Sequence, residues 1–105
     1  MSNLIQAARE QVAALTQAAY EKAAAEGLLP AGAEVKATIE IPKDAAHGDY
    51  ASSFAMAGAK ALRKAPRQIA QIIVDHLELD GSFFDKVDIA GPGFLNFTLG
   101  SKWYG

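Results

Sequence analysis

Two runs of alternating apolar and polar residues fill the last third of this 105-residue sequence. The runs cover residues 84–90 and 94–99, and Gly91-Pro92-Gly93 separates them. A two-residue period is typical of a strand with one buried face, and a short connection containing glycine and proline is typical of a tight turn. The sequence therefore predicts a β-hairpin in this region.

The first quarter of the chain has the spacing of a long amphipathic helix, from Leu4 to about Glu26. Apolar residues recur there at steps of three and four: Leu4, Ala8, Val12, Leu15, Ala19 and Ala23. Such steps place side chains on one helical face. Ser2 or Asn3 is suited to cap the first turn, and Gly27 is suited to end the helix.

Two shorter helices are predicted in the middle of the chain. One begins after Asp49 as its N-cap and continues to about Lys64, with these residues facing inward: Phe54, Ala55, Gly58 and Leu62. Gly58 indicates close helix packing. The other has Pro66 in its first turn and extends to about Leu79, with this apolar stripe: Ile69, Ile72, Ile73 and Leu77.

Residues 35–41 alternate in the manner of a half-buried strand, which Pro42 ends. The predicted order is therefore helix, strand, helix, helix, hairpin. This order predicts an α+β fold of two layers, in which a small antiparallel sheet of three to four strands packs against three helices. We expect residues 1–100 to form one domain, because 105 residues suit a single modest core.

Composition narrows the function classes. The sequence contains no cysteine, which excludes disulfides and thiolate metal sites and fits a reducing cytoplasm. We expect neither a secretory signal nor a membrane span. The formal net charge of −2 argues against binding nucleic acid mainly by bulk electrostatics, because neutralising phosphates requires many cations.

The second hairpin strand carries the strongest functional pattern. Alternation assigns Leu95, Phe97 and Leu99 to one face and Phe94, Asn96 and Thr98 to the other. Phe94 and Asn96 together offer an unstacked base a ring to stack on and an amide for its edge. The alternative is that Phe94 only packs under a helix, as aromatic residues in strands often do.

A cationic cluster precedes and enters the third helix: Lys60, Arg63, Lys64 and Arg67. The first three lie at i, i+3 and i+4, so a continuous helix would present them on one side, where they could bind phosphates. Alternatively, these cations stay solvated and interact favourably with a helix C-terminus.

The segment His47-Gly48-Asp49-Tyr50 places a histidine near a carboxylate, which is one pattern of acid–base catalysis. No nucleophile setting, phosphate-binding glycine loop or metal-ligand spacing accompanies it. A helix cap at Asp49 explains the segment better. We interpret His76 as a partly buried structural histidine.

Several segments together resemble the N-terminal additional domain of bacterial arginyl-tRNA synthetase. They are Ile39-Glu40-Ile41-Pro42-Lys43, His47-Gly48-Asp49-Tyr50-Ala51-Ser52, Ala55-Met56, Pro66-Arg67-Gln68-Ile69-Ala70 and Ala90-Gly91-Pro92-Gly93-Phe94-Leu95-Asn96-Phe97. Their order and spacing span nearly the whole chain. No single segment is decisive, whereas the set is specific.

The resemblance implies a domain that lies against the outer corner of tRNA and reads its D-loop. Phe94 and Asn96 match the family positions that stack on and hydrogen-bond an extruded base, commonly adenine, and Gly91 matches a position beside that base. The partners implied are arginine-specific tRNA and a class I catalytic domain in the same chain, with residues 101–105 beginning the linker toward it. ATP is the cofactor implied for the full-length ligase, while the chain itself binds no cofactor or metal and catalyses nothing. We expect a cytoplasmic monomer.

Two other function classes remain open on the sequence alone. One is a protein-interaction or regulatory module that uses the alanine-rich helix at the N-terminus. The other is a small hydrolase that uses His47 and Asp49.

Overall fold

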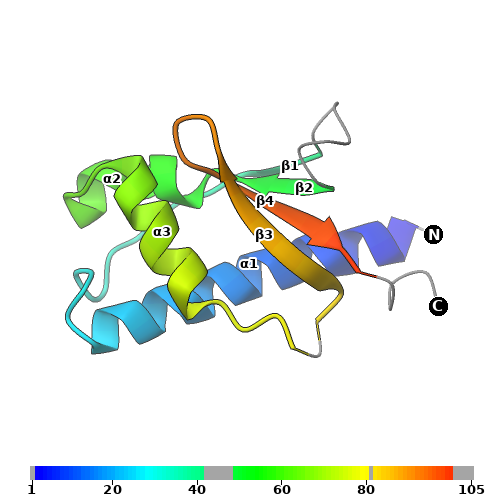
Figure 1. The fold of residues 1–105 in the computed structure, drawn as a ribbon, viewed down its shortest axis with the longest axis horizontal. Helices are drawn as coiled ribbons and strands as arrows, with labels where there is room; N and C mark the ends of the chain where they lie inside the picture. Colours follow the sequence, from blue (N-terminus) through cyan, green and yellow to red (C-terminus); the bar gives the residue numbers. More distant parts are fainter. Residues whose placement is uncertain (1, 42–48, 81, 101–105) are drawn as a thin grey trace.

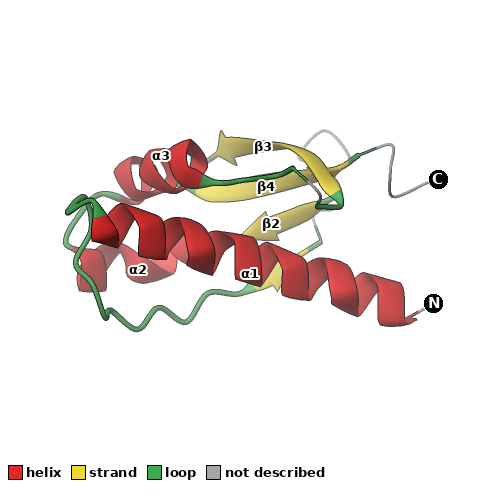
Figure 2. Ribbon diagram, turned by 90° about the horizontal axis from the view of Figure 1, so that it is seen from below, coloured by secondary structure: helices red, strands yellow, loops and turns green. Residues whose placement is uncertain are grey.

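A computed structural model describes residues 2–41, 49–80 and 82–100 of the chain (Figure 1). Its elements are α1 (Ser2–Ala25), β1 (Ile39–Glu40), β2 (Tyr50–Ser52), α2 (Phe54–Leu62), α3 (Pro66–His76), β3 (Phe84–Ala90) and β4 (Phe94–Leu99). The strands form one antiparallel sheet in the order β1-β2-β4-β3. Each of the three helices contacts the sheet, and Figure 2 shows α1 running along one side of it. The predicted two-layer α+β fold is confirmed.

Aromatic side chains fill the centre of the core between the layers. The Phe84 ring packs edge-on against Phe97 and Tyr50, with centroid distances of 5.4 and 5.9 Å. Such pairs add stability beyond their buried area. The helices contribute these fully buried residues to the same core: Ala8, Val12, Ala23, Leu62, Ile69, Ala70 and Ile73.

The buried face of α1 agrees with the predicted stripe. Ala8, Val12, Ala19 and Ala23 are buried, and Leu15 is half-buried. The side chain of Leu4 and those of the predicted caps, Ser2 and Asn3, lie outside the described residues. The apolar face of α1 is buried within its own domain. That face is therefore not available to bind a second chain.

The predicted strand over residues 35–41 is wrong in length. Only Ile39 and Glu40 pair with β2, because β2 has three residues and Ser53 then leads directly into α2. Val35 instead packs against Gly58, where an added Cβ would lie 3.1 Å from the valine Cγ2. Gly58 therefore accommodates this loop segment, in place of the neighbouring helix that we predicted.

Asp49 does not cap a helix, contrary to the prediction. Its N–H donates to the Phe97 carbonyl over 2.8 Å, and its Oδ2 accepts the Leu99 N–H over 2.8 Å. These bonds begin β2, which the sequence analysis missed and which lies fully buried between β1 and β4. The helix α2 starts later, after Ser53.

The predicted ends of α2 and α3 are also too late. α2 stops at Leu62 because Arg63 adopts a left-handed conformation with φ of 56°. α3 begins at Pro66 as predicted and ends at His76, three residues before the expected Leu79.

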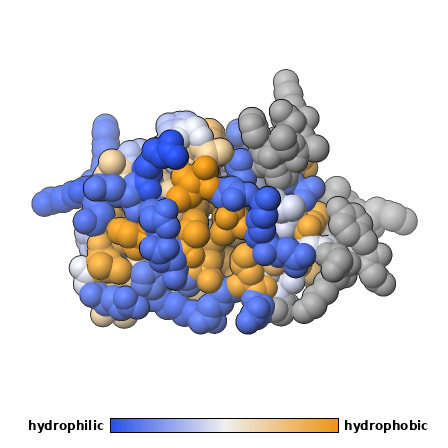
Figure 3. All heavy atoms as spheres, viewed as in Figure 1, coloured by the Kyte–Doolittle hydropathy of each residue, from blue (hydrophilic) through white to orange (hydrophobic). Residues whose placement is uncertain are grey.

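Polar residues break up the apolar surface. On the side of the molecule seen in Figure 3, hydrophobic residues gather over the centre with hydrophilic ones around and between them. The large hydrophobic side chains that are exposed in the described part of the chain are Leu28 and Ile41, at 42% and 55%. No helix among the described residues is long and apolar enough to cross a membrane.

Candidate nucleic-acid interface

The register of the sheet places four side chains in one row on the face opposite the core. Asn96 pairs with Ala51 on β2 and with Asp88 on β3, and Ala51 pairs with Glu40 on β1. Directly paired residues in an antiparallel sheet point to the same face. Glu40, Ala51, Asn96 and Asp88 therefore form what we call the outer row. Phe94, two residues before Asn96, projects to this face as well.

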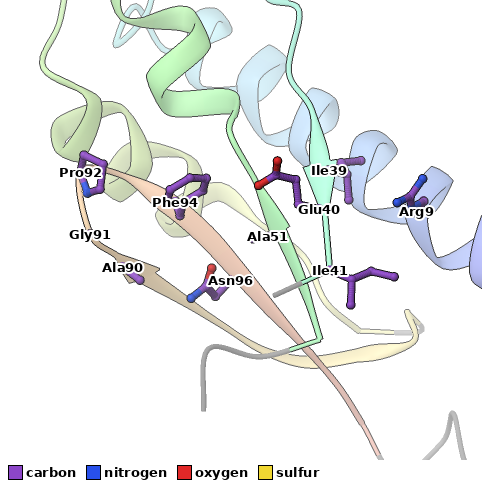
Figure 4. Close-up of a pocket in the computed structure, with 10 residues that line it drawn as sticks. All are labelled: Arg9, Ile39, Glu40, Ile41, Ala51, Ala90, Gly91, Pro92, Phe94 and Asn96. Atoms are coloured by element: carbon purple, nitrogen blue, oxygen red, sulfur yellow. The ribbon is translucent and has the colours of Figure 1, made fainter. Parts of the chain in front are cut away.

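A pocket of 660 Å³ opens along this face (Figure 4). Phe94 and Asn96 line it from β4, and Ala51 lines it from β2. Residues 39–41, which are β1 and the residue after it, line another side. Among the described residues, Ala90, the hairpin turn and Arg9 of α1 also line it. The volume falls within the usual range of small-ligand sites, so the pocket has room for a single base.

Phe94 is half-buried and stands outside the hydrophobic core cluster. In the view of Figure 4 its ring lies between Pro92 of the turn and Glu40 of β1. The ring retains an accessible surface on the pocket side, where another planar group can stack.

Asn96 is 5% exposed, and its amide makes no hydrogen bond within the described residues. Every side-chain nitrogen or oxygen sealed from solvent in this part of the chain has a hydrogen-bond partner. The Asn96 amide is therefore not sealed, and it keeps a free donor and a free acceptor on a residue that lines the pocket.

The hairpin turn is held against the start of α3. Gly91 and Gly93 have φ of 54° and 137°, and the Gly93 N–H donates to the Ala90 carbonyl over 3.2 Å. Arg67 Nη1 donates to the Gly91 carbonyl over 3.1 Å. Gly91 contributes backbone to the pocket wall, with its carbonyl already engaged by Arg67.

The predicted cationic cluster does not form one helical side. Lys60 is in the last turn of α2, Arg63 is left-handed, and Lys64 follows the helix. All three are exposed, and none lines the pocket. Arg67 alone reaches the hairpin, so the structure separates it from the other three.

Of the two histidines, His76 is described by the structure and His47 is not. His47 lies outside the described residues, whereas Asp49 has its carboxylate bonded to the Leu99 N–H and belongs to the sheet. His76 joins helix ends, because Nδ1 lies 2.7 Å from the Ile72 carbonyl and Nε2 lies 3.2 Å from Glu26 Oε1. The backbone hydrogen bond with Ile72 raises the pKa of His76, and Glu26 raises it further. This agrees with a structural role for His76.

The described residues contain no group of three or more His, Cys, Asp or Glu side chains able to hold a metal ion. Sequence reasoning missed Arg9, Glu40 and Ala51 as pocket residues. The alternation around Ile39 signalled that Glu40 projects opposite to the buried face. Nothing in the sequence pattern connected Arg9 or Ala51 with Asn96, because the sheet register brings them together.

Comparison with known proteins agrees with this fold. The model of the family "Arginyl tRNA synthetase N terminal domain" matches residues 3–99. The chain belongs to this family. An arginine–tRNA ligase of Acetivibrio thermocellus is 40% identical over 103 residues, which cover 98% of this chain and 18% of that protein.

Two solved structures share the fold of this arginyl-tRNA synthetase N-terminal domain. The arginyl-tRNA synthetase of Thermus thermophilus superimposes with a TM-score of 0.59 at 30% identity, over 85% of this chain and 14% of its own. That of Plasmodium falciparum superimposes with a TM-score of 0.69 at 14% identity, over 90% of this chain and 16% of its own, and shows the fold alone. The chain thus spans less than a fifth of these relatives.

Proposed function

We propose that this domain reads one unstacked base in the D-loop of arginine-specific tRNA. The observation that carries the proposal is that Phe94 and Asn96 line one and the same pocket. A ring that can stack and an amide that can hydrogen-bond a base edge are the elements of single-base recognition. The small side chain of Ala51 beside Asn96 leaves room for the base.

The charge of the pocket supports recognition of a base over recognition of phosphate. Among the described residues that line it, the charged ones are Arg9 and Glu40, which balance each other formally. A site that reads bases needs few cations, because phosphate contacts position a complex while base contacts specify it. The formal net charge of −2 for the chain fits the same division of roles.

The domain acts within a longer arginine–tRNA ligase in this proposal. A catalytic domain in the same chain binds ATP and attaches arginine, and the described domain contributes part of the tRNA contact. The ligase works in the cytoplasm as a monomer. Relatives named arginine–tRNA ligases over 98% of this chain support this assignment. An interaction module built on α1 is disfavoured, because the apolar face of α1 is buried in the core.

The test uses three changes at Phe94 in the full-length ligase that carries this domain. Phe94→Ala and Phe94→Leu should each lower kcat/KM for tRNA, with a full loss of the stack giving about 5- to 150-fold, because base–aromatic stacking is worth about 1–3 kcal/mol. Phe94→Tyr keeps a ring and should retain most activity. The KM values for arginine and ATP at saturating tRNA should stay unchanged.

Thr98→Ala serves as the matched control. Thr98 lies on the same face of β4 as Phe94 and pairs with Lys86 of β3, but it does not line the pocket. The kcat/KM of the Thr98→Ala enzyme for tRNA should equal that of the unmodified enzyme. Equal tRNA kinetics for the Leu and Tyr variants at position 94 would refute stacking.

A further inference from the structure

Glu40 stands at one end of the outer row, separated from Asn96 only by Ala51. Two strand spacings of about 4.8 Å place the Glu40 and Asn96 backbones roughly 9.6 Å apart. Ala51 between them has no side chain beyond Cβ, so the space above it is open to a planar ring. Figure 4 shows the Glu40 carboxylate directed from β1 toward the side of the pocket where Phe94 lies.

The Glu40 carboxylate is available to a ligand. Glu40 is exposed and makes no hydrogen bond or ion pair with any described residue, although Arg9 lines the same pocket. The carboxylate at the opposite end of the outer row differs, because Asp88 pairs with Lys86 over 3.5 Å and does not line the pocket. Of the two acidic side chains in the row, Glu40 alone faces the pocket with unengaged oxygens.

An ionised carboxylate can only accept hydrogen bonds. It attracts the amino group of a base and repels carbonyl oxygens and phosphates. Hydrogen bonds to charged groups are also stronger than neutral ones. A base stacked on Phe94 with one edge on the Asn96 amide therefore meets, at the Glu40 side, a group that discriminates amino from carbonyl substituents.

We propose that Glu40 is a specificity-determining residue, which makes the pocket select a base carrying an exocyclic amino group over its carbonyl counterpart. This inference rests on the proposed function, since it assumes that a base enters the pocket. A competing role for Glu40 is to block pairing at the sheet edge, as charged residues on edge strands do. That role needs no base and sets no base preference.

The experiment uses full-length ligase and tRNA transcripts changed at one D-loop position. That position is the one where an abasic site reduces kcat/KM most. The base there is set in turn to adenine, hypoxanthine, cytosine and uracil, which gives two pairs that differ by amino against carbonyl. The unmodified enzyme should prefer the amino member of at least one pair by about tenfold, since a hydrogen bond to a charged group contributes about that factor.

Glu40→Gln should reduce this preference severalfold, because the glutamine amide can donate to a carbonyl oxygen as well as accept. Asp88→Asn is the matched control and should leave the preference unchanged. An amino preference that is absent in the unmodified enzyme, or equal in the Glu40→Gln enzyme, would overturn the inference. Phe94→Leu, assayed in parallel, separates the two proposals: unchanged tRNA kinetics in that variant refute base reading itself.

Discussion

Gly93→Ala should destabilise the domain through the contact between the hairpin turn and α3. Gly93 has φ of 137°, which residues with a side chain rarely adopt. An added Cβ would also lie 3.0 Å from Pro66 Cβ and 3.2 Å from the Pro66 carbonyl carbon. These two atoms belong to the proline ring and backbone at the start of α3, so Pro66 can move only slightly away from the added Cβ.

The magnitude follows from two contributions. Backbone strain at such a conformation is worth about 1–3 kcal/mol, and overpacking against a fixed neighbour adds about 1–3 kcal/mol. The free energy of unfolding should therefore fall by about 2–6 kcal/mol. For a domain of this size, the lower bound corresponds to a decrease in Tm of roughly 8 °C or more.

Urea unfolding of the 105-residue chain, followed by circular dichroism, measures the change. Gly32→Ala is the matched control, because Gly32 has φ of 76° but nothing within 4 Å of an added Cβ. It should lower the free energy of unfolding by about 1 kcal/mol. Equal losses for the two variants would show that the Pro66 contact carries no strain, and would refute the reasoning.

Two further predictions concern the sheet and the helix ends. Asp49→Ala leaves the partly buried Leu99 N–H without its acceptor. Urea unfolding should therefore show a decrease in the free energy of unfolding of about 1–3 kcal/mol, and a smaller decrease for Asp49→Asn. A decrease for Asp49→Ala that is no greater than that for Asp49→Asn would contradict this. The raised pKa of His76 means that its contribution to stability is fully present below pH 6.5 and is lost as pH rises through the raised value. The free energy of unfolding of His76→Gln relative to the unmodified chain should therefore improve as pH increases across that window, and parallel pH profiles would contradict it.

The hairpin was predictable because its alternation is local. Residues 84–90 and 94–99 each carry a complete two-residue pattern, and the structure gives both strands those bounds. The burial of Leu95 and Phe97 on one face followed from the same pattern. The same alternation assigns Phe94 and Asn96 to the other face, and this assignment needs no tertiary contact.

The strand β2 escaped prediction for a physical reason. Its three residues, Tyr50–Ser52, are too few to show a period, and all are buried because strands flank them on both sides. Asp49 has the chemistry of a helix cap but bonds across the sheet to Leu99 instead. Local propensity could not reveal that partner, which lies fifty residues along the chain.

The composition of the pocket also depended on long-range pairing. Glu40 and Asn96 share a face only through the register of β1, β2 and β4. Arg67 joins the hairpin by a hydrogen bond to Gly91 across 24 residues. The alternation in residues 94–99 indicates a strand suited to base recognition. The fold determines which groups surround that strand.

The most direct test of base reading is a double-mutant cycle between the protein and the tRNA. Phe94→Leu in the full-length ligase is combined with an abasic site at each D-loop position in turn, and kcat/KM for tRNA is measured. At one position the two losses should fail to add, because each removes the same stack. Additive losses at every D-loop position would contradict the account, since Phe94 would then contact no D-loop base.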